Sequence, residues 1–525
     1  MEKGIYKGFH GVKDTAPGVV RGECVIDVTL PDYLPEIRRI FGASATAQPT
    51  GKYLSGGKAE FAGTVRHVVY CGNADGGGNA DGGVSVLPLS GDYLLSFPAP
   101  DGCDPALLPV VCDTPICRLV GPRRISIRTP VSAAARCYEP RESSPSLPTL
   151  TADPDVIPLI HPVETHRAAT LSLRDVRLGD VIRADGEVKV LSCEAVACVR
   201  EATPTAAGVE ARGDVGITLK LDRGDGIPSE ARRKIPFSEV IPWEGEPLPG
   251  GSASAWACVT SCEVSPSDGE TASEISVDLT LDLCAEATAA VEEEALVDLF
   301  SQKEPTTVKT EGIVVTDVCF AGGGIYTLEG DAERSECNCE DAMTVLGESA
   351  AVSVESATIG EDGATVSGEC RVFATVGSPS GDPEGGTVYT AADFRFPFSV
   401  SVPVPAACRG ARKVDATAYP ISVTVRLDAA RLLASVECAF TVRLSSETEV
   451  TVVESVERGE GAYPERAPGE IVAVYPEGGE TLWEIALRYG VSPAAVADRN
   501  GLPDTAKAEP DAANSLDGVV RLLIG

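Results

Sequence analysis

The chain has 525 residues, which is too long for a single hydrophobic core and indicates about three to four domains. Apolar residues make up 43% and aromatic residues only 5%, and the many Val, Ala and Thr residues favour pleated sheets over helix bundles. The formal net charge of −34 repels nucleic-acid phosphates and anionic lipid surfaces, so no nucleic-acid or membrane partner is expected.

The first residues, MEKGIYKGFHGVKDTAPGVV, carry two early lysines with no apolar run behind them. No stretch of the chain reaches the roughly 20 apolar residues of a membrane-spanning helix. We therefore expect a cytosolic protein without membrane insertion. The 17 cysteines are widely spaced and odd in number, which is typical of reduced thiols that pack as small hydrophobic side chains.

Three stretches about 150 residues apart repeat one pattern. Each places a glycine, at position 63, 213 or 368, before an alternating apolar strand: KAEFAGTVRHVVY (58–70), GVEARGDVGITLKL (208–221) and GATVSGECRVFATV (363–376). A second segment lies upstream of each stretch, at 41–54, 193–203 and 349–359. Each pair of segments predicts a β-hairpin.

Further similarities follow downstream in each repeat. RKIPFSEVIP (233–242) and FRFPFSVSVP (394–403) share Pro-Phe-Ser between alternating apolar positions, and LLSFPAP (94–100) is a looser counterpart in the first repeat. Each repeat closes with a long alternating run, at 123–135, 273–285 and 431–444. Alternation over that length indicates a strand with one buried face, so each repeat is predicted to be a β domain of mainly antiparallel strands.

The opening VIDVTLPDYLPEIRRIFGASATA (25–47), together with the glycine and Pro-Phe-Ser segments, resembles the SPOCS domain of spore-coat morphogenetic proteins. Only the first repeat keeps the Leu-Pro-Asp motif, and the equivalent segments at 166–191 and 308–320 diverge. The resemblance implies three tandem SPOCS-like β domains, at 1–150, 151–290 and 291–456, followed by a linker at 457–469.

Two patterns invite a metal-binding interpretation. GNADGGGNADGG (72–83) contains Asp75 and Asp81, but calcium repeats need several stacked turns with an apolar core, so a flexible hairpin loop is favoured. Cys337 and Cys339 stand close together without a nearby His or second cysteine pair, whereas tetrahedral zinc needs four ligands. No metal and no cofactor are expected.

The four histidines do not stand in a catalytic motif. His10, His67, His161 and His166 lie outside any Gly-x-Ser-x-Gly, His-Glu-x-x-His or Cys-His setting, and no Gly-x-x-x-x-Gly-Lys-Ser/Thr loop is present. PDVIPLIHPVETH (154–166) reads as a solvated linker, and VEEEALVDLF (291–300) as a short amphipathic helix between the second and third repeats. We expect no catalytic residues and no enzyme activity.

The C-terminal stretch GGETLWEIALRYGVSPAAVADRNGL (478–502) predicts two short helices. Thr481 and Glu484 form a capping box, and Gly490 supplies a left-handed stop. Ser492 and Pro493 begin a second helix that ends at Gly501. The flanking runs IVAVY (471–475) and VVRLLI (519–524) are expected to be the two strands of a small sheet.

This β-α-α-β pattern, with Gly-x-Thr-Leu-Trp-x-Ile-Ala and a later Asn-x-Leu, resembles a LysM domain over 470–525. The family binds N-acetylglucosamine chains in a shallow groove between the loop before the first helix and the loop after the second. The resemblance implies that the groove is lined by seven residues, with Leu482 packing on the acetamido methyl. They are Gly479, Glu480, Thr481 and Leu482 on one side, with Asn500, Gly501 and Leu502 opposite.

Two departures from the family pattern favour a protein ligand. Glu480 replaces the usual Asp, and the loop at 503–517 is longer than usual and covers or reshapes the groove. Trp483 has two interpretations: it is a partly exposed anchor for a partner protein, or it packs against Leu487 or the sheet.

The resemblance to SPOCS units followed by a LysM domain implies a non-enzymatic scaffold in spore-coat assembly. By resemblance, the LysM domain docks a coat-basement ATPase of the SpoIVA type, and the protein lies in the mother-cell cytoplasm at the forespore surface. The alternative is a protein of the wall or cortex that binds peptidoglycan glycan chains. Retention of the protein by purified cortex separates the two hypotheses.

Overall fold

The computed structural model describes residues 6–16, 18–73, 84–103, 105–223, 228–266, 272–379, 387–459, 463 and 470–525. Strands hold 71% of the chain and helices 6%, which confirms the prediction of a mainly β protein. The loop prediction for the repeat at 72–83 concerns residues 74–83, which lie outside the described residues. Among the described residues, no helix has the length and apolar character needed to span a bilayer.

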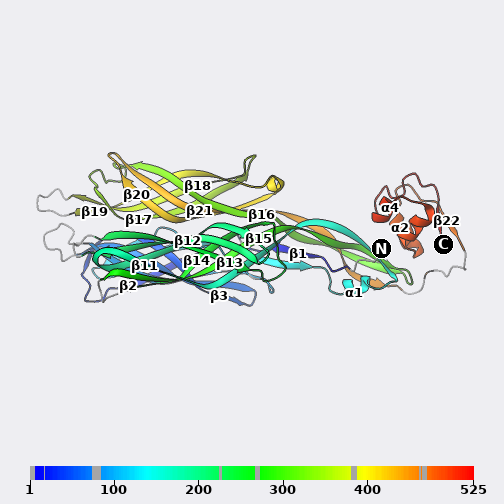
Figure 1. Cartoon of the computed structure of the whole chain (residues 1–525), viewed down its shortest axis with the longest axis horizontal. Helices are drawn as coiled ribbons and strands as arrows, with labels where there is room; N and C mark the ends of the chain where they lie inside the picture. Colours follow the sequence, from blue (N-terminus) through cyan, green and yellow to red (C-terminus); the bar gives the residue numbers. More distant parts are fainter. Residues whose placement is uncertain are drawn as a thin grey trace.

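One two-sheet plan occurs three times along the chain (Figure 1). We call the three occurrences units 1, 2 and 3. Unit 1 comprises β1 (His10–Asp14), β2 (Val19–Thr29), β3 (Ile37–Ser55), β4 (Lys58–Asn73), β5 (Val84–Pro98), β6 (Ala106–Leu107), β7 (Val111–Cys112), β8 (Ile116–Gly121), β9 (Arg124–Arg136) and β10 (Tyr138–Glu142).

Units 2 and 3 follow with longer strands. Unit 2 comprises α1 (Leu147–Thr151), β11 (Val156–Pro204), β12 (Gly208–Asp222), β13 (Ser229–Pro242), β14 (Ser252–Pro266) and β15 (Ala272–Ser301). Unit 3 comprises β16 (Thr306–Glu333), β17 (Thr344–Ile359), β18 (Ala364–Pro379), β19 (Thr387–Val402), a 3-10 helix (Ala406–Gly410), β20 (Lys413–Leu427) and β21 (Arg431–Arg458).

The strand order is the same in each unit. One antiparallel sheet has the order β2-β9-β8 in unit 1, β11-β15-β14 in unit 2 and β16-β21-β20 in unit 3. The other has the order β3-β4-β5, β11-β12-β13 and β17-β18-β19, with the long β11 serving both sheets of unit 2. Each pair of sheets encloses its own apolar core, as alternating burial along the strands requires. The three predicted hairpins are therefore confirmed.

The repeated glycines lie under aromatic rings of the neighbouring strand. Gly213 pairs with Phe237, and Gly368 pairs with Phe398, so the Phe of each Pro-Phe-Ser segment covers a glycine. A Cβ at either glycine would lie 2.0 Å from a backbone carbonyl oxygen. In unit 1 the residue opposite Gly63 is Tyr93, which precedes the predicted counterpart LLSFPAP. The prediction was therefore out of register there, because the aromatic residue that covers the glycine is Tyr rather than Phe.

The first and last strands of each unit continue beyond its sandwich as a two-stranded ribbon. These ribbons are β1 with β10, the start of β11 with the end of β15, and the start of β16 with the end of β21. They pack on one another through two apolar clusters that include Tyr6 and Phe9. We call this bundle the stalk; in Figure 1 it runs from the body toward the C-terminal domain.

The stalk corrects two sequence predictions. Residues 291–300 are not a helix but the end of β15, and 156–166 are not a linker but the start of β11. Partners cover both faces of this ribbon: Ala295 and Leu299 contact the other ribbons, and Phe300 contacts the C-terminal domain. Burial on two faces gives an apolar spacing that resembles a helix. The domain limits expected after residues 150, 290 and 456 accordingly fall within α1, β15 and β21.

A buried ionic network joins the three units where the stalk begins. Arg136, Glu286 and Arg443 each stand eleven residues after the first buried position of the closing strand of their unit. Arg136 Nε donates to Glu286 Oε2 at 2.9 Å, and Arg443 Nε lies 2.9 Å from Glu286 Oε1. Tyr138 also donates to Glu286, and Arg443 pairs with Asp14 at 2.8 Å. All three units thus contribute to the same network, unit 1 through Asp14, Arg136 and Tyr138.

Candidate binding site

The C-terminal domain has its own small core. It comprises β22 (Val472–Val474), α2 (Leu482–Tyr489), α3 (Pro493–Asn500), α4 (Asp504–Ala508) and β23 (Leu522–Ile524), and β22 pairs with β23 in antiparallel register. The predicted capping box is present, because the Thr481 hydroxyl accepts from Glu484 N and the Glu484 carboxylate accepts from Thr481 N. Gly490 and Gly501 end the two helices in left-handed conformations, as expected. Ser492 precedes α3 but makes no side-chain cap.

The structure uses most of the seven predicted groove residues inside the domain. Leu482 is 0% exposed and lies in the domain core, with Leu502 packed against the same cluster. Leu482 thus packs inside the domain, and its contact with an acetamido methyl stays a prediction. The Asn500 amide donates to Val496 O at 2.8 Å and to Leu523 O at 2.9 Å, and its oxygen accepts from Leu523 N at 2.7 Å. Asn500 thus ties α3 to β23.

The remaining groove residues are turn residues and a salt-bridged glutamate. Gly479 and Gly501 have positive φ values, and a Cβ built on either would have no neighbour within 4 Å, so both turns are open. The Glu480 carboxylate accepts from Arg488 and from Glu477 N. The side chain of Glu480 is 8% exposed, so it stabilises the loop before α2.

The long segment at 503–517 covers the start of α2. It contributes Ala506 and Leu516 to the domain core. Pro510 O accepts from Trp483 N at 2.8 Å, and Ser515 Oγ accepts from Leu482 N at 3.1 Å. The first backbone donors of a helix are ordinarily free to bind a ligand, but two of them are satisfied here within the chain.

Trp483 is the contact between the LysM-like domain and the stalk. Its side chain is 5% exposed, which disagrees with one of the two interpretations, that of a partly exposed anchor. The indole lies edge-on to the Phe300 ring, with centroids 5.1 Å apart, and its Nε1 donates to Asp298 Oδ2 at 2.8 Å. The structure agrees better with the interpretation that Trp483 packs inside the chain. The surface that Trp483 contacts belongs to β15 of unit 2.

Other contacts complete this docking interface. Leu159 and Ala486 are buried in the same apolar cluster as Trp483. His161 Nε2 lies 2.9 Å from Asp511 Oδ2, where both side chains are partly exposed. From the connecting segment, the Tyr463 hydroxyl donates to Leu487 O at 3.3 Å. No sequence pattern predicted these contacts, because their partners are more than 150 residues apart or lie in an unpatterned connection.

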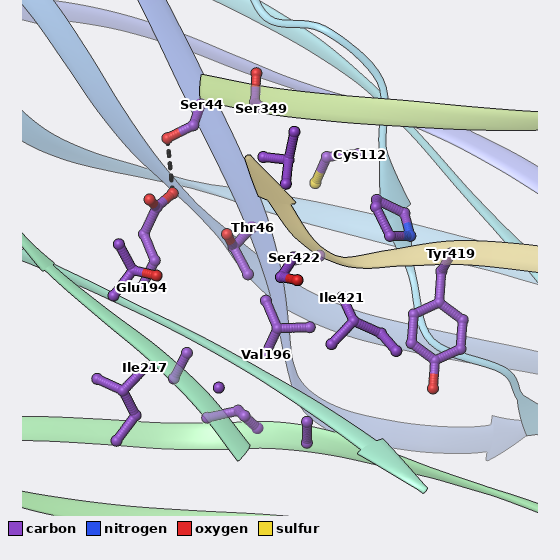
Figure 2. A pocket seen from close by; sticks show the side chains of 18 of the residues that line it. Ser44, Thr46, Cys112, Glu194, Val196, Ile217, Ser349, Tyr419, Ile421 and Ser422 are labelled. Carbon is purple, nitrogen blue, oxygen red and sulfur yellow. Dashed lines mark hydrogen bonds between the residues drawn. The ribbon is translucent and has the colours of Figure 1, made fainter. Parts of the chain in front are cut away.

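A second candidate site is a cavity of about 230 Å³ where the three units meet (Figure 2). Its wall combines apolar side chains such as Val196, Ile217 and Ile421 with hydroxyl groups. Ser44 Oγ donates to Glu194 Oε1 at 2.6 Å, which joins unit 1 to unit 2. Burial raises the pKa of the Glu194 carboxyl above its ordinary value, although Ser44 and Lys220 oppose the shift.

The charged groups beside this cavity bind one another across unit boundaries. Lys220 Nζ donates to Glu230 within unit 2 and to Leu346 O of unit 3 at 3.1 Å. Arg232 donates to Glu348 of unit 3. These pairs satisfy the charges that line the cavity, so the arrangement explains unit packing better than it explains a ligand site.

Comparison with known proteins agrees with the C-terminal domain alone. The LysM domain family model matches residues 478–511, so the chain contains a LysM domain. No curated protein matches the chain. The crystal structure of Pseudomonas aeruginosa OccK9 (OpdG) aligns over 85% of this chain and 99% of that chain, at 8% identity and a TM-score of 0.09. A TM-score that low carries no argument about the fold.

Proposed function

We propose that the protein is a non-enzymatic scaffold whose three-unit body holds the LysM domain in a fixed position as an adaptor for a protein ligand. The observation that carries the proposal is that the groups of the LysM groove are already bound within the chain. Leu482, Asn500 and the first donors of α2 are all engaged within the chain. A surface whose polar groups are already paired offers little to a glycan, which is recognised mainly through hydrogen bonds.

We further propose a role in spore-coat assembly of the SipL type, at the forespore surface, with a SpoIVA-type ATPase as the ligand of the LysM domain. The support is the order of the parts, three repeated β units followed directly by one LysM domain, together with the SPOCS-like opening at 25–47. This role rests on resemblance. It places the protein in the mother-cell cytoplasm and assigns ATP hydrolysis to the partner.

The test is affinity capture from sporulating cells with the full chain and with a chain that ends at residue 459. We expect an ATPase to be captured by the full chain and lost from the shortened one. A fluorescent fusion of the full chain should form a ring around the forespore. Identical capture lists from both chains, or a diffuse fusion, would contradict the proposal.

Binding to peptidoglycan is the second candidate function. LysM domains bind peptidoglycan and N-acetylglucosamine chains, and the open turns at Gly479 and Gly501 favour this alternative. Sedimentation of the full chain with purified peptidoglycan tests it. Retention that soluble N-acetylglucosamine oligomers compete away would establish glycan binding and displace the adaptor proposal.

A further inference from the structure

The excess of acidic over basic residues lies entirely after residue 150, whereas residues 1–150 have no net charge. Residues 1–150 hold 15 Lys and Arg and 15 Asp and Glu, whereas the remaining residues carry the whole net charge of −34. Unit 1 is therefore the part of the molecule that a second, strongly acidic chain approaches with the least repulsion.

One sheet face of unit 1 is both basic and apolar; we call it the basic face. On it, Arg128 of β9 lies between Val25 of β2 and Ile116 of β8 in the antiparallel register. Val25 and Ile116 are about half exposed, at 48% and 54%. The basic face consists of Arg21, Val25, Ile116, Arg118, Val120, Arg124 and Arg128, all exposed.

The arginines of the basic face are free to bind a partner. Within the part of the chain that the structure describes, no ion pair is made by Arg21, Arg118, Arg124 or Arg128. Glu23 and Asp27 lie exposed on the same face of β2, and exposed Asp113 lies beside Pro130 of β9, so four arginines face three carboxylates and the face keeps a small net positive charge. Exposed guanidinium groups beside apolar side chains are typical of protein interfaces, where Arg binds carboxylates in bidentate geometry.

An exposed tyrosine stands at the rim of the basic face. Tyr33 is 85% exposed and lies in the turn between β2 and β3. Arg123 Nη1 clamps this turn by donating to Pro31 O at 2.9 Å and to Leu34 O at 2.8 Å. Leu30 N also donates to Arg123 O, next to Arg124. The backbone that carries Tyr33 is thus held in place, which lowers part of the entropic cost of using the side chain as a contact.

The same chain carries a complementary acidic surface on the stalk. Exposed glutamates lie along the ribbon of β16 and β21: Glu447 and Glu449, opposite Thr316 and Val314, share one face, Glu311 lies on the other face opposite Val452, and Glu454 stands at a register shift. Among the described residues these four make no ion pair. In Figure 1, β2 lies on the body, away from the end where the stalk meets the LysM domain, so a contact between the two surfaces joins different molecules.

We infer that the basic face of unit 1 is a self-assembly surface that binds the acidic ribbon of β16 and β21 on a second copy of this chain. The two surfaces are different, so the contact is heterologous. Heterologous contacts form rings when the rotation closes and open chains when it does not. Self-assembly of this kind is independent of what the LysM domain binds.

Sedimentation velocity of the full chain over a concentration series tests the inference. In about 50 mM NaCl we expect association that weakens in about 500 mM NaCl, because the contact is electrostatic. The variant with Arg118→Glu, Arg124→Glu and Arg128→Glu should weaken association by at least about tenfold in Kd. Tyr33→Ala should weaken it without changing the salt dependence.

A matched control separates the basic face from the total charge. Arg177→Glu, Arg409→Glu and Arg426→Glu make the same change in net charge at exposed positions elsewhere and should leave association unchanged. The counterpart variant with Glu447→Lys, Glu449→Lys and Glu454→Lys should associate poorly alone. Mixed with the Arg→Glu variant of the basic face, it should restore assembly.

Three outcomes would overturn the inference. One is a wild-type chain that stays monomeric at low salt throughout the series. Another is an equal loss of association in the control variant, or a mixture of the charge-reversed chains that remains monomeric. The third is retention of a monomeric wild type on heparin or anionic vesicles, which would assign the face to a polyanion.

Discussion

The three units meet around buried charges, whereas the LysM domain meets the stalk around one tryptophan. Arg136, Glu286 and Arg443 are each less than 5% exposed, and each belongs to a different unit. The contact of Trp483 with Phe300 and Asp298 is mostly apolar and has one side-chain hydrogen bond through the indole. A buried ion pair costs much when one partner is lost, so it specifies how units are joined. An apolar contact of this size is easier to separate.

Removing one charge from the body should have the largest effect. Glu286→Gln leaves two buried guanidiniums without their shared carboxylate, so we expect a loss of about 3–5 kcal/mol in the free energy of unfolding. Chemical denaturation checks this value. Arg431→Gln is the control on an exposed pair with Asp331, and it should cost less than about 1 kcal/mol. Equal losses in the two variants would show that the buried network is not what joins the units.

The second prediction concerns release of the LysM domain. Trp483→Ala should detach the domain and leave it folded, because Trp483 lies outside the domain core formed by Leu482, Ile485 and Val496. A buried Trp→Ala change costs about 3–5 kcal/mol, and we expect this loss in the free energy with which the LysM domain docks on the stalk. Small-angle scattering should show a longer molecule, and proteolysis within 459–470 should accelerate. Trp243→Ala, in unit 2, should leave the domain docked; unfolding of the LysM domain itself would contradict the prediction.

The third prediction concerns pH and unit 1. His67 is 1% exposed, and burial lowers its pKa to about 4 from an ordinary value of 6.5. Because the unfolded chain binds the proton more readily, stability is full above about pH 6.5 and falls as the pH drops toward 4. The shift corresponds to about 3 kcal/mol. Thermal melts between pH 7 and 4 should show a shallower slope in His67→Gln than in the wild type, whereas His10→Gln at an exposed position should change nothing.

Sequence patterns predicted the parts whose structure depends on nearby residues. The three hairpins, the capping box at Thr481, and the pairing of β22 with β23 all follow from alternation and helix caps. The stalk was not predictable in this way, because the apolar spacing of 291–300 reflects neighbours on both faces that lie far away in the chain. The burial of Trp483 depends on Phe300. Pro510 and Ser515 accept from the first backbone N–H groups of α2, and no motif links these two residues to α2.

The smallest predicted effect is the difference in stability lost when the side chains at the two helix N-termini of the LysM domain are removed. Thr481→Ala removes a side-chain cap that accepts from Glu484 N at 3.2 Å, so we expect a loss of about 1 kcal/mol. Ser492→Ala should cost only a few tenths, about 0.3 kcal/mol, because Ser492 makes no side-chain cap in the structure. The melting of the LysM domain, followed in the undocked Trp483→Ala background, gives both values. Because docking then contributes nothing, equal losses at the two positions would mean that the cap at Thr481 does not stabilise α2.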